Sequence, residues 1–177
     1  MDIEQLRYPI GQFTVPASIS ALQLRNYIDD IRYLPAQLEL AVQNLDSHQL
    51  ETPYRPGGWT INQVVHHVAD SHMNALIRVK LALTEDNPII KPYEEHLWAE
   101  LPDVAATPIN MSVTLLHALH TRWVNLLDRL SEEQWARTFM HPANKTTSTL
   151  KVATANYSWH GKHHLAHIEN LKERNNW

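Results

Sequence analysis

The sequence predicts an all-α protein, a four-helix bundle, on three observations. Four glycines and ten prolines are spread thinly over 177 residues, which leaves long stretches without helix breakers. These stretches place apolar residues at steps of three and four rather than in alternation. There are four of them, and they share no repeat, which is typical of a bundle. We expect one domain, residues 1–177.

Caps and apolar steps bound the expected helices. Pro35 lies inside the first helix and is expected to kink it. Thr60 and Gln63 form a T-x-x-Q capping box before the second helix. The four long helices are expected to run from Ser18 or Ser20 through Leu45, from Thr60 to about Thr84, from about Pro108 to Leu130, and from about Leu150 to Arg174.

The segments between the helices have their own signals. Residues 52–59, TPYRPGGW, form a turn-rich break. Four prolines mark residues 85–108 as a long crossover loop, which can span the bundle and roof a pocket. Ser131 and Gln134 cap a short turn, and residues 137–149 are expected to form a loop or a small hairpin before the last helix.

Composition excludes several classes of function. No cysteine is present, so disulfides, thiolate metal sites and cysteine nucleophiles are excluded. Lysine and arginine total 15 against 19 acidic residues, and no basic block occurs, so nucleic acid and anionic membranes are poor partners. No apolar run is long enough to cross a membrane. The N-terminus has no signal-peptide pattern, so we expect a cytoplasmic protein.

The last helix carries the main chemical signal, WHGKHHLAH over residues 159–167. A helical wheel places His160 and His164 on the apolar face, one turn apart, with His163 toward solvent and His167 at the border. Two imidazoles at i and i+4 can converge on one metal ion. They can equally be hydrogen-bonded core histidines, and the pattern alone does not decide between these interpretations.

A second cluster, VVHHVADSH over residues 64–72, lies on the second helix. The wheel places His72 inside the apolar arc, His67 on its polar flank and His66 on the outer face. Either His67 or His72 can therefore reach an internal site. His120, at the edge of the third helix's apolar face, is a candidate pocket wall, a partner of a metal ligand or a structural histidine.

Several motifs of the chain resemble those of a known family. The strings PYRPGGWTINQVVHHVADSHMNALIRVKLALTE, LLHALHTRW and WHGKHHLAHI, together with YPIG near the N-terminus, resemble the DinB-like superfamily, and most closely its YfiT branch. Members are described as metal-dependent hydrolases and are linked to bacillithiol S-transferase activity. The resemblance covers essentially the whole chain. It implies a homodimer and a four-helix bundle with a three-histidine metal site, whose ligands match His67, His160 and His164.

Three imidazoles without a thiolate leave an open coordination position, which is typical of a catalytic site. Zinc fits best, and nickel, manganese or iron bind similar nitrogens. In one hypothesis the metal acidifies a water molecule that attacks a small amide or ester. In the other it binds a low-molecular-weight thiol such as bacillithiol, whose thiolate attacks an electrophile. A non-catalytic stress-response metal-binding protein is the alternative.

Further residues are candidates for the pocket of a small-molecule substrate. His120, Arg78 and Asp70 are possible pocket residues. A thiol that bears carboxylates would also need cations near the metal, and Arg55, Arg78 and Lys162 are the candidates. For each of these cations, a solvated surface charge is the more common role.

Overall fold

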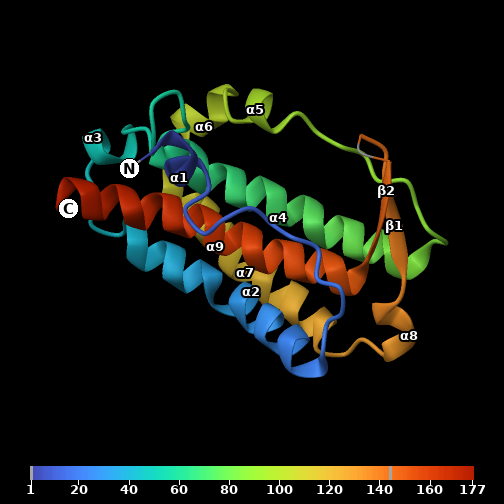
Figure 1. Ribbon diagram of the computed structural model, residues 1–177. Coiled ribbons are helices and arrows are strands. Elements are labelled where there is room, and N and C mark those ends of the chain that lie inside the picture. The colour runs from blue at the N-terminus through green and yellow to red at the C-terminus, as the bar shows by residue number, and fades with distance from the viewer. Residues whose placement is uncertain (1, 144) are drawn as a thin grey trace.

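The computed structural model describes residues 2–143 and 145–177 and confirms the four-helix bundle (Figure 1). Four long helices form it, each within a few residues of its expected bounds. They are α2 (Ala21–Val42), α4 (Ile61–Thr84), α7 (Ile109–Leu127) and α9 (Leu150–Asn175). The predicted capping box of Thr60 with Gln63 is present, and Ser20, one of the two expected start positions of the first helix, forms another with Gln23. The first and third helices end three residues earlier than expected, at Val42 and Leu127.

The order of the helices around the bundle differs from their order in the chain. Helix α2 packs against α7 and α9, and α4 packs against the same two helices. The consecutive helices α2 and α4 are therefore diagonal to each other, and their connection must cross one end of the bundle. That connection holds the short helix α3 (Ser47–Leu50) and the turn at residues 52–59. Helix α1 (Ile3–Arg7) lies at the same end (Figure 1).

The predicted hairpin closes the other end of the bundle (Figure 1). Strands β1 (Thr138–His141) and β2 (Thr146–Thr149) pair antiparallel, after the short helix α8 (Glu132–Trp135). Arg137 ties the hairpin to the last turn of α4 by donating to the carbonyls of Ala82 and Glu85. These carbonyls lie in the part of a helix that lacks intrahelical donors, so the arginine satisfies groups that would otherwise need water.

The crossover loop between α4 and α7 contains two short helices, α5 (Glu95–Trp98) and α6 (Pro102–Ala106). It runs back along α4, as Figure 1 shows. The side chains of Asn62 and Gln63 fix it there by donating to the carbonyls of Val104 (2.8 Å) and Ala99 (3.0 Å). None of the helices in residues 2–143 and 145–177 combines the length and apolar character that crossing a bilayer requires.

Helices α2 and α9 approach closely at Gly161. A Cβ atom at this position would lie 2.5 Å from Cδ2 of the buried Leu34. Glycine therefore removes a steric barrier between the two helices, next to His160. Its lower helix propensity, about 1 kcal/mol below that of alanine, is offset by this packing.

Replacing Gly161 by valine should lower the free energy of unfolding by about 1–3 kcal/mol, because the added methyl groups must displace Leu34. Denaturant unfolding of the variant measures the loss. In a Leu34→Ala background the same substitution should cost less, since the alanine leaves room. An equal cost in both backgrounds would contradict the importance of this contact.

Candidate metal centre

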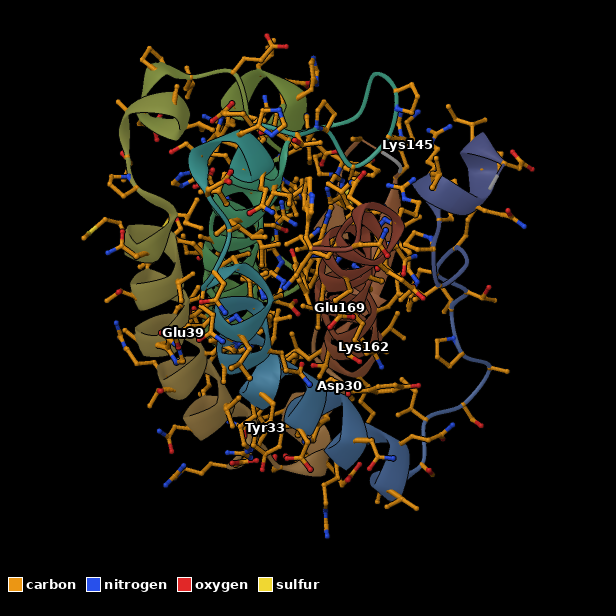
Figure 2. The ribbon with its side chains drawn as sticks, turned by 90° about the vertical axis from the view of Figure 1, so that its left-hand side faces the viewer. Asp30, Tyr33, Glu39, Lys145, Lys162 and Glu169 are labelled. Carbon is orange, nitrogen blue, oxygen red and sulfur yellow. The ribbon has the colours of Figure 1, made fainter. Side chains whose placement is uncertain are left out.

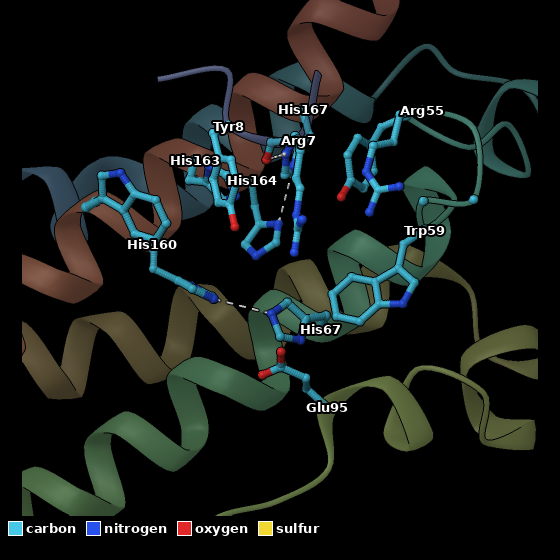
Figure 3. A pocket seen from close by; sticks show the side chains of 14 residues that line it. Arg7, Tyr8, Arg55, Trp59, His67, Glu95, His160, His163, His164 and His167 are labelled. Carbon is cyan, nitrogen blue, oxygen red and sulfur yellow. Dashed lines mark hydrogen bonds between the residues drawn. The ribbon is translucent and has the colours of Figure 1, made fainter. Parts of the chain in front are cut away.

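Three histidines from two helices converge near the end of the bundle that carries α1. His67 comes from α4, and His160 and His164 come from successive turns of α9. Each offers a ring nitrogen, and the three nitrogens lie within 4.8 Å of one another. The Nε2 atoms of His67 and His160 are 3.3 Å apart. Figure 3 shows the three rings pointing into one pocket. The structure thus brings together the three residues that the resemblance implies as ligands.

The charge state of these rings suits a metal. Burial, reinforced by the neighbouring imidazoles, lowers the pKa of His67 to about 4 and holds the pKa values of His160 and His164 well below the ordinary value. All three are therefore neutral at pH 7 and keep a lone pair. Two nitrogens bound to tetrahedral zinc at about 2.0–2.1 Å lie roughly 3.3 Å apart. The spacing between His67 and His160 fits this donor geometry.

A cavity of about 390 Å³ opens beside the three imidazoles. Its volume lies in the range of small-molecule binding sites. Three connections build its walls, namely the segment of α1, the turn at residues 52–59 and the start of α5. Besides the histidines, the side chains that these connections contribute include Arg7, Tyr8, Arg55, Trp59 and Glu95. Glu95 is the only carboxylate among the described lining residues, and Figure 3 shows it on the His67 side.

The turn at residues 52–59 owes its shape to two glycines. Gly57 has a φ of 65°, a conformation that glycine adopts without strain. A Cβ at Gly58 would lie 2.7 Å from Cγ of Arg55, so this glycine leaves room for the arginine side chain. The turn ends at Trp59, whose ring packs 4.6 Å from that of His67. The sequence PGGW thus places one cation and one aromatic wall at the cavity.

Of the three cations proposed from the sequence, only Arg55 lines this cavity. Arg78 donates instead to the hydroxyl of Tyr157 (3.1 Å) and lines a separate cavity beside the hairpin. Lys162 forms a surface ion pair with Asp30 at 2.6 Å, and Figure 2 labels the two residues close together. Arg78 and Lys162 therefore lie outside this cavity, which a helical wheel does not reveal because it gives a direction around the helix axis but no position along the bundle.

The other predicted pocket residues also lie outside the cavity. His120 is buried behind His72, and their rings are joined by a hydrogen bond of 2.9 Å. Asp70 is partly buried and faces Asp103 of α6, whose charge helps to raise its pKa. Arg7 and Glu95 also line the cavity, and neither was a candidate from the sequence. Both lie in short helices outside the bundle, where no long periodic pattern indicates which way a side chain points.

Two histidines are buried where the wheel predicted solvent. His163 is 7% exposed, stacks on Trp159 at 4.5 Å and faces Tyr8 of the N-terminal segment. His66 contacts the hydroxyl of Ser112 (2.8 Å) and the carbonyl of Thr107 (3.1 Å). In both cases a segment outside the four long helices, or leading into one of them, covers the helix face. A wheel does not include such segments.

Comparison with known proteins identifies the family of the chain. The family model described as the DinB superfamily matches residues 31–168. The chain belongs to this superfamily. A protein of Bacillus cereus strain ATCC 10987, named "Putative metal-dependent hydrolase", is 54% identical over 99% of this chain and all of its own length. A protein of the same name from Bacillus anthracis strain CDC 684 is 53% identical with the same coverage.

A solved structure is also closely similar. It is YfiT from Bacillus subtilis, described as "a probable metal-dependent hydrolase with an unusual four-helix bundle topology". The two structures superpose with a TM-score of 0.96 at 47% sequence identity. The match covers 98% of this chain and 99% of that one. Membership of the family and the fold therefore agree along essentially the whole chain.

Alanine at His67, His160 or His164 should abolish stoichiometric zinc binding, because each substitution removes one of only three nitrogens in the cluster. His163→Ala should retain the metal, since His163 lies outside the cluster although it lines the cavity. Metal analysis of the purified variants measures this. A full complement of metal in all three ligand variants would rule out the site.

Replacing Asp70 by asparagine should stabilise the protein at neutral pH. Burial and the nearby Asp103 raise the pKa of Asp70 to about 6, above its value of 3.8 in an unfolded chain. Such a group costs nothing below about pH 4, costs increasing stability as the pH rises from about 4 to about 6, and has its full cost above that. We expect a gain of about 1 kcal/mol at pH 7 that disappears near pH 4. Urea unfolding at both pH values tests this, and equal gains would contradict it.

Proposed function

We propose that this protein is a metal-dependent hydrolase that acts on a small substrate carrying a negative charge. The observation that carries the proposal is the convergence of three neutral imidazoles at a cavity that also contains Glu95, Arg7 and Arg55. Three nitrogen ligands leave coordination positions open for water or substrate. The names of the related proteins support the reaction class and leave the substrate open.

The roles of the protein's own residues follow from their chemistry. When bound, a divalent metal such as zinc or nickel would polarise a substrate carbonyl and lower the pKa of a water molecule that it holds. Glu95 would accept the proton that the attacking water loses and pass it to the leaving group. His163 lines the same cavity and offers a second group for proton transfer. Trp59 and Trp159 would exclude water from the apolar part of the substrate.

Arg55 is the residue that favours an anionic substrate. Its guanidinium lies over the ring of Tyr54, and among the described residues its one hydrogen bond goes to the carbonyl of Pro56 (3.0 Å). Its buried Nε has no hydrogen-bond partner, and it forms no ion pair with any described carboxylate. A cation without a protein counter-ion at a cavity is available for a carboxylate or phosphate of the substrate.

Transfer of a low-molecular-weight thiol is the second candidate function. Arg7 and Arg55 at the cavity favour this reaction too, because a thiol such as bacillithiol bears carboxylates that would need cations beside the metal. In this reaction Glu95 would take the proton of the thiol, and the sulfur would displace a leaving group from an electrophile. The chain has no cysteine that would compete as nucleophile or ligand.

One set of assays separates these functions. The zinc-loaded protein is incubated with a panel of anionic esters and amides, and separately with a generic electrophile plus bacillithiol, glutathione, coenzyme A or cysteine. Hydrolysis that stops on chelation supports the hydrolase, and thiol-specific, metal-dependent conjugation supports the transferase. Absence of both in metal-loaded protein favours the non-catalytic metal-binding alternative.

On whichever substrate is turned over, Glu95→Gln should lower kcat by about 10²–10⁴-fold, the usual contribution of a general base. Arg55→Gln should mainly raise KM, because it removes substrate binding. Glu94→Gln is the matched control, since Glu94 is exposed, adjacent in sequence and outside the cavity. A Glu95 variant with the kcat of the control would exclude this residue as the base.

A further inference from the structure

A chain of hydrogen-bonded histidines runs from the cluster into the core. Nδ1 of His160 lies 3.2 Å from Nε2 of His72, which is fully buried. Nδ1 of His72 lies 2.9 Å from Nε2 of His120. Nδ1 of His120 ends the chain at the backbone carbonyl of Ile31, 2.5 Å away. Each ring uses both nitrogens, one toward each neighbour.

Pro35 explains why the carbonyl of Ile31 is available. In a continuous α-helix this carbonyl accepts from the N–H four residues later. That residue is Pro35, which has no N–H, and α2 continues through it. The proline therefore leaves the Ile31 carbonyl without its usual donor at the point where His120 reaches α2 from α7.

The carbonyl sets the direction of the whole chain. A carbonyl only accepts, so Nδ1 of His120 must carry a proton. His120 is 1% exposed, and none of these three rings forms an ion pair with a carboxylate of the described residues, so each is neutral. A neutral ring with a proton on Nδ1 accepts at Nε2. His72 and then His160 must therefore also carry their protons on Nδ1, which leaves the lone pair of His160 on Nε2.

A second, shorter chain applies the same constraint to His164. Nε2 of His167 lies 3.1 Å from the backbone carbonyl of Arg7, so it must be the donor there. Arg7 is the last residue of α1, and a carbonyl at a helix end lacks an intrahelical donor. Nδ1 of the neutral His167 is then an acceptor, and Nδ1 of His164 lies 3.4 Å from it. The lone pair of His164 is again left on Nε2, and Figure 3 shows this ring pointing into the pocket.

We propose that His72, His120 and His167 are positioning residues, which hold His160 and His164 in the Nδ1–H form so that both offer Nε2 to the metal. This inference rests on the metal centre of the proposed function and not on the reaction that occurs there. Partners that orient ligand histidines are often carboxylates, which add negative charge. Here the partners are neutral, so the orientation adds no charge to the centre.

Nuclear magnetic resonance of the metal-free protein tests the proposal without metal or activity. Long-range ¹H–¹⁵N correlations of the imidazoles distinguish the two tautomers. We expect the Nδ1–H form at His72, His120, His160 and His164, and the Nε2–H form at His167. The Nε2–H form at His160 or His164 would overturn the proposal. Because no substrate or metal is present, the result stands or falls separately from the proposed function.

Zinc affinity of His72 variants provides a second test. His72→Phe removes the acceptor for His160 and should lower the affinity about 10- to 100-fold. His72→Gln should stay within a few-fold of the parent, because its amide oxygen can accept from His160 while its amide nitrogen donates to His120. His66→Phe is the matched control, a buried histidine of the same helix that contacts Ser112 and Thr107 instead. It should leave the affinity unchanged.

The outcomes of the titration are distinct. Parent-like affinity in a folded His72→Phe protein would overturn the proposal, and so would equal losses in the phenylalanine and glutamine variants. Circular dichroism establishes that each variant is folded. If the phenylalanine variant does not fold, the tautomers of the unsubstituted protein decide the matter alone.

Discussion

The structure depends on burying many imidazoles without charge. Seven of the twelve histidines are buried, in a bundle whose core is otherwise apolar. A buried neutral imidazole has one donor and one acceptor, and leaving either unmatched is costly. The fold supplies acceptors where the regular backbone leaves them free, at the helix-internal Pro35 and at the end of α1. Segments that look peripheral in the sequence are therefore needed by the core.

The unusual helix order likewise makes the cavity depend on segments outside the four long helices. Because α2 and α4 are diagonal, their connection crosses the end of the bundle, where it places Trp59 beside His67 and Arg55 at the same cavity. The crossover loop returns along α4 and adds Glu95. Rigid helices hold the candidate ligands, and loops supply the groups that meet the substrate. This division lets loop residues change specificity without disturbing the imidazoles.

Features set by neighbouring residues in the sequence could be predicted, whereas side-chain burial caused by distant segments could not. Helix caps and apolar steps are local, so the four long helices were predicted, and the hairpin is one of the two structures expected for residues 137–149. The pair His160 and His164 followed from helical spacing, but His67 could be chosen over His72 only through the family resemblance. His163 and His66 were predicted to face solvent because a helical wheel assumes that any helix face turned away from the bundle core is exposed. Covering by the N-terminal segment and by residues 104–112 is a tertiary effect.

The charges of the residues around the cavity bear on the proposed substrate, which the fold alone does not indicate. The chain carries a net charge of −4, yet three neutral imidazoles with neutral partners bring no negative charge to the candidate centre. Arg7 and Arg55 lie at the same cavity, against the single carboxylate of Glu95. Arg7 is also paired with Glu4 at 3.7 Å, so Arg55 is the cation of the cavity lining that pairs with no carboxylate of the described residues. A guanidinium without a protein counter-ion, beside imidazoles that add no negative charge, favours the anionic substrate proposed above.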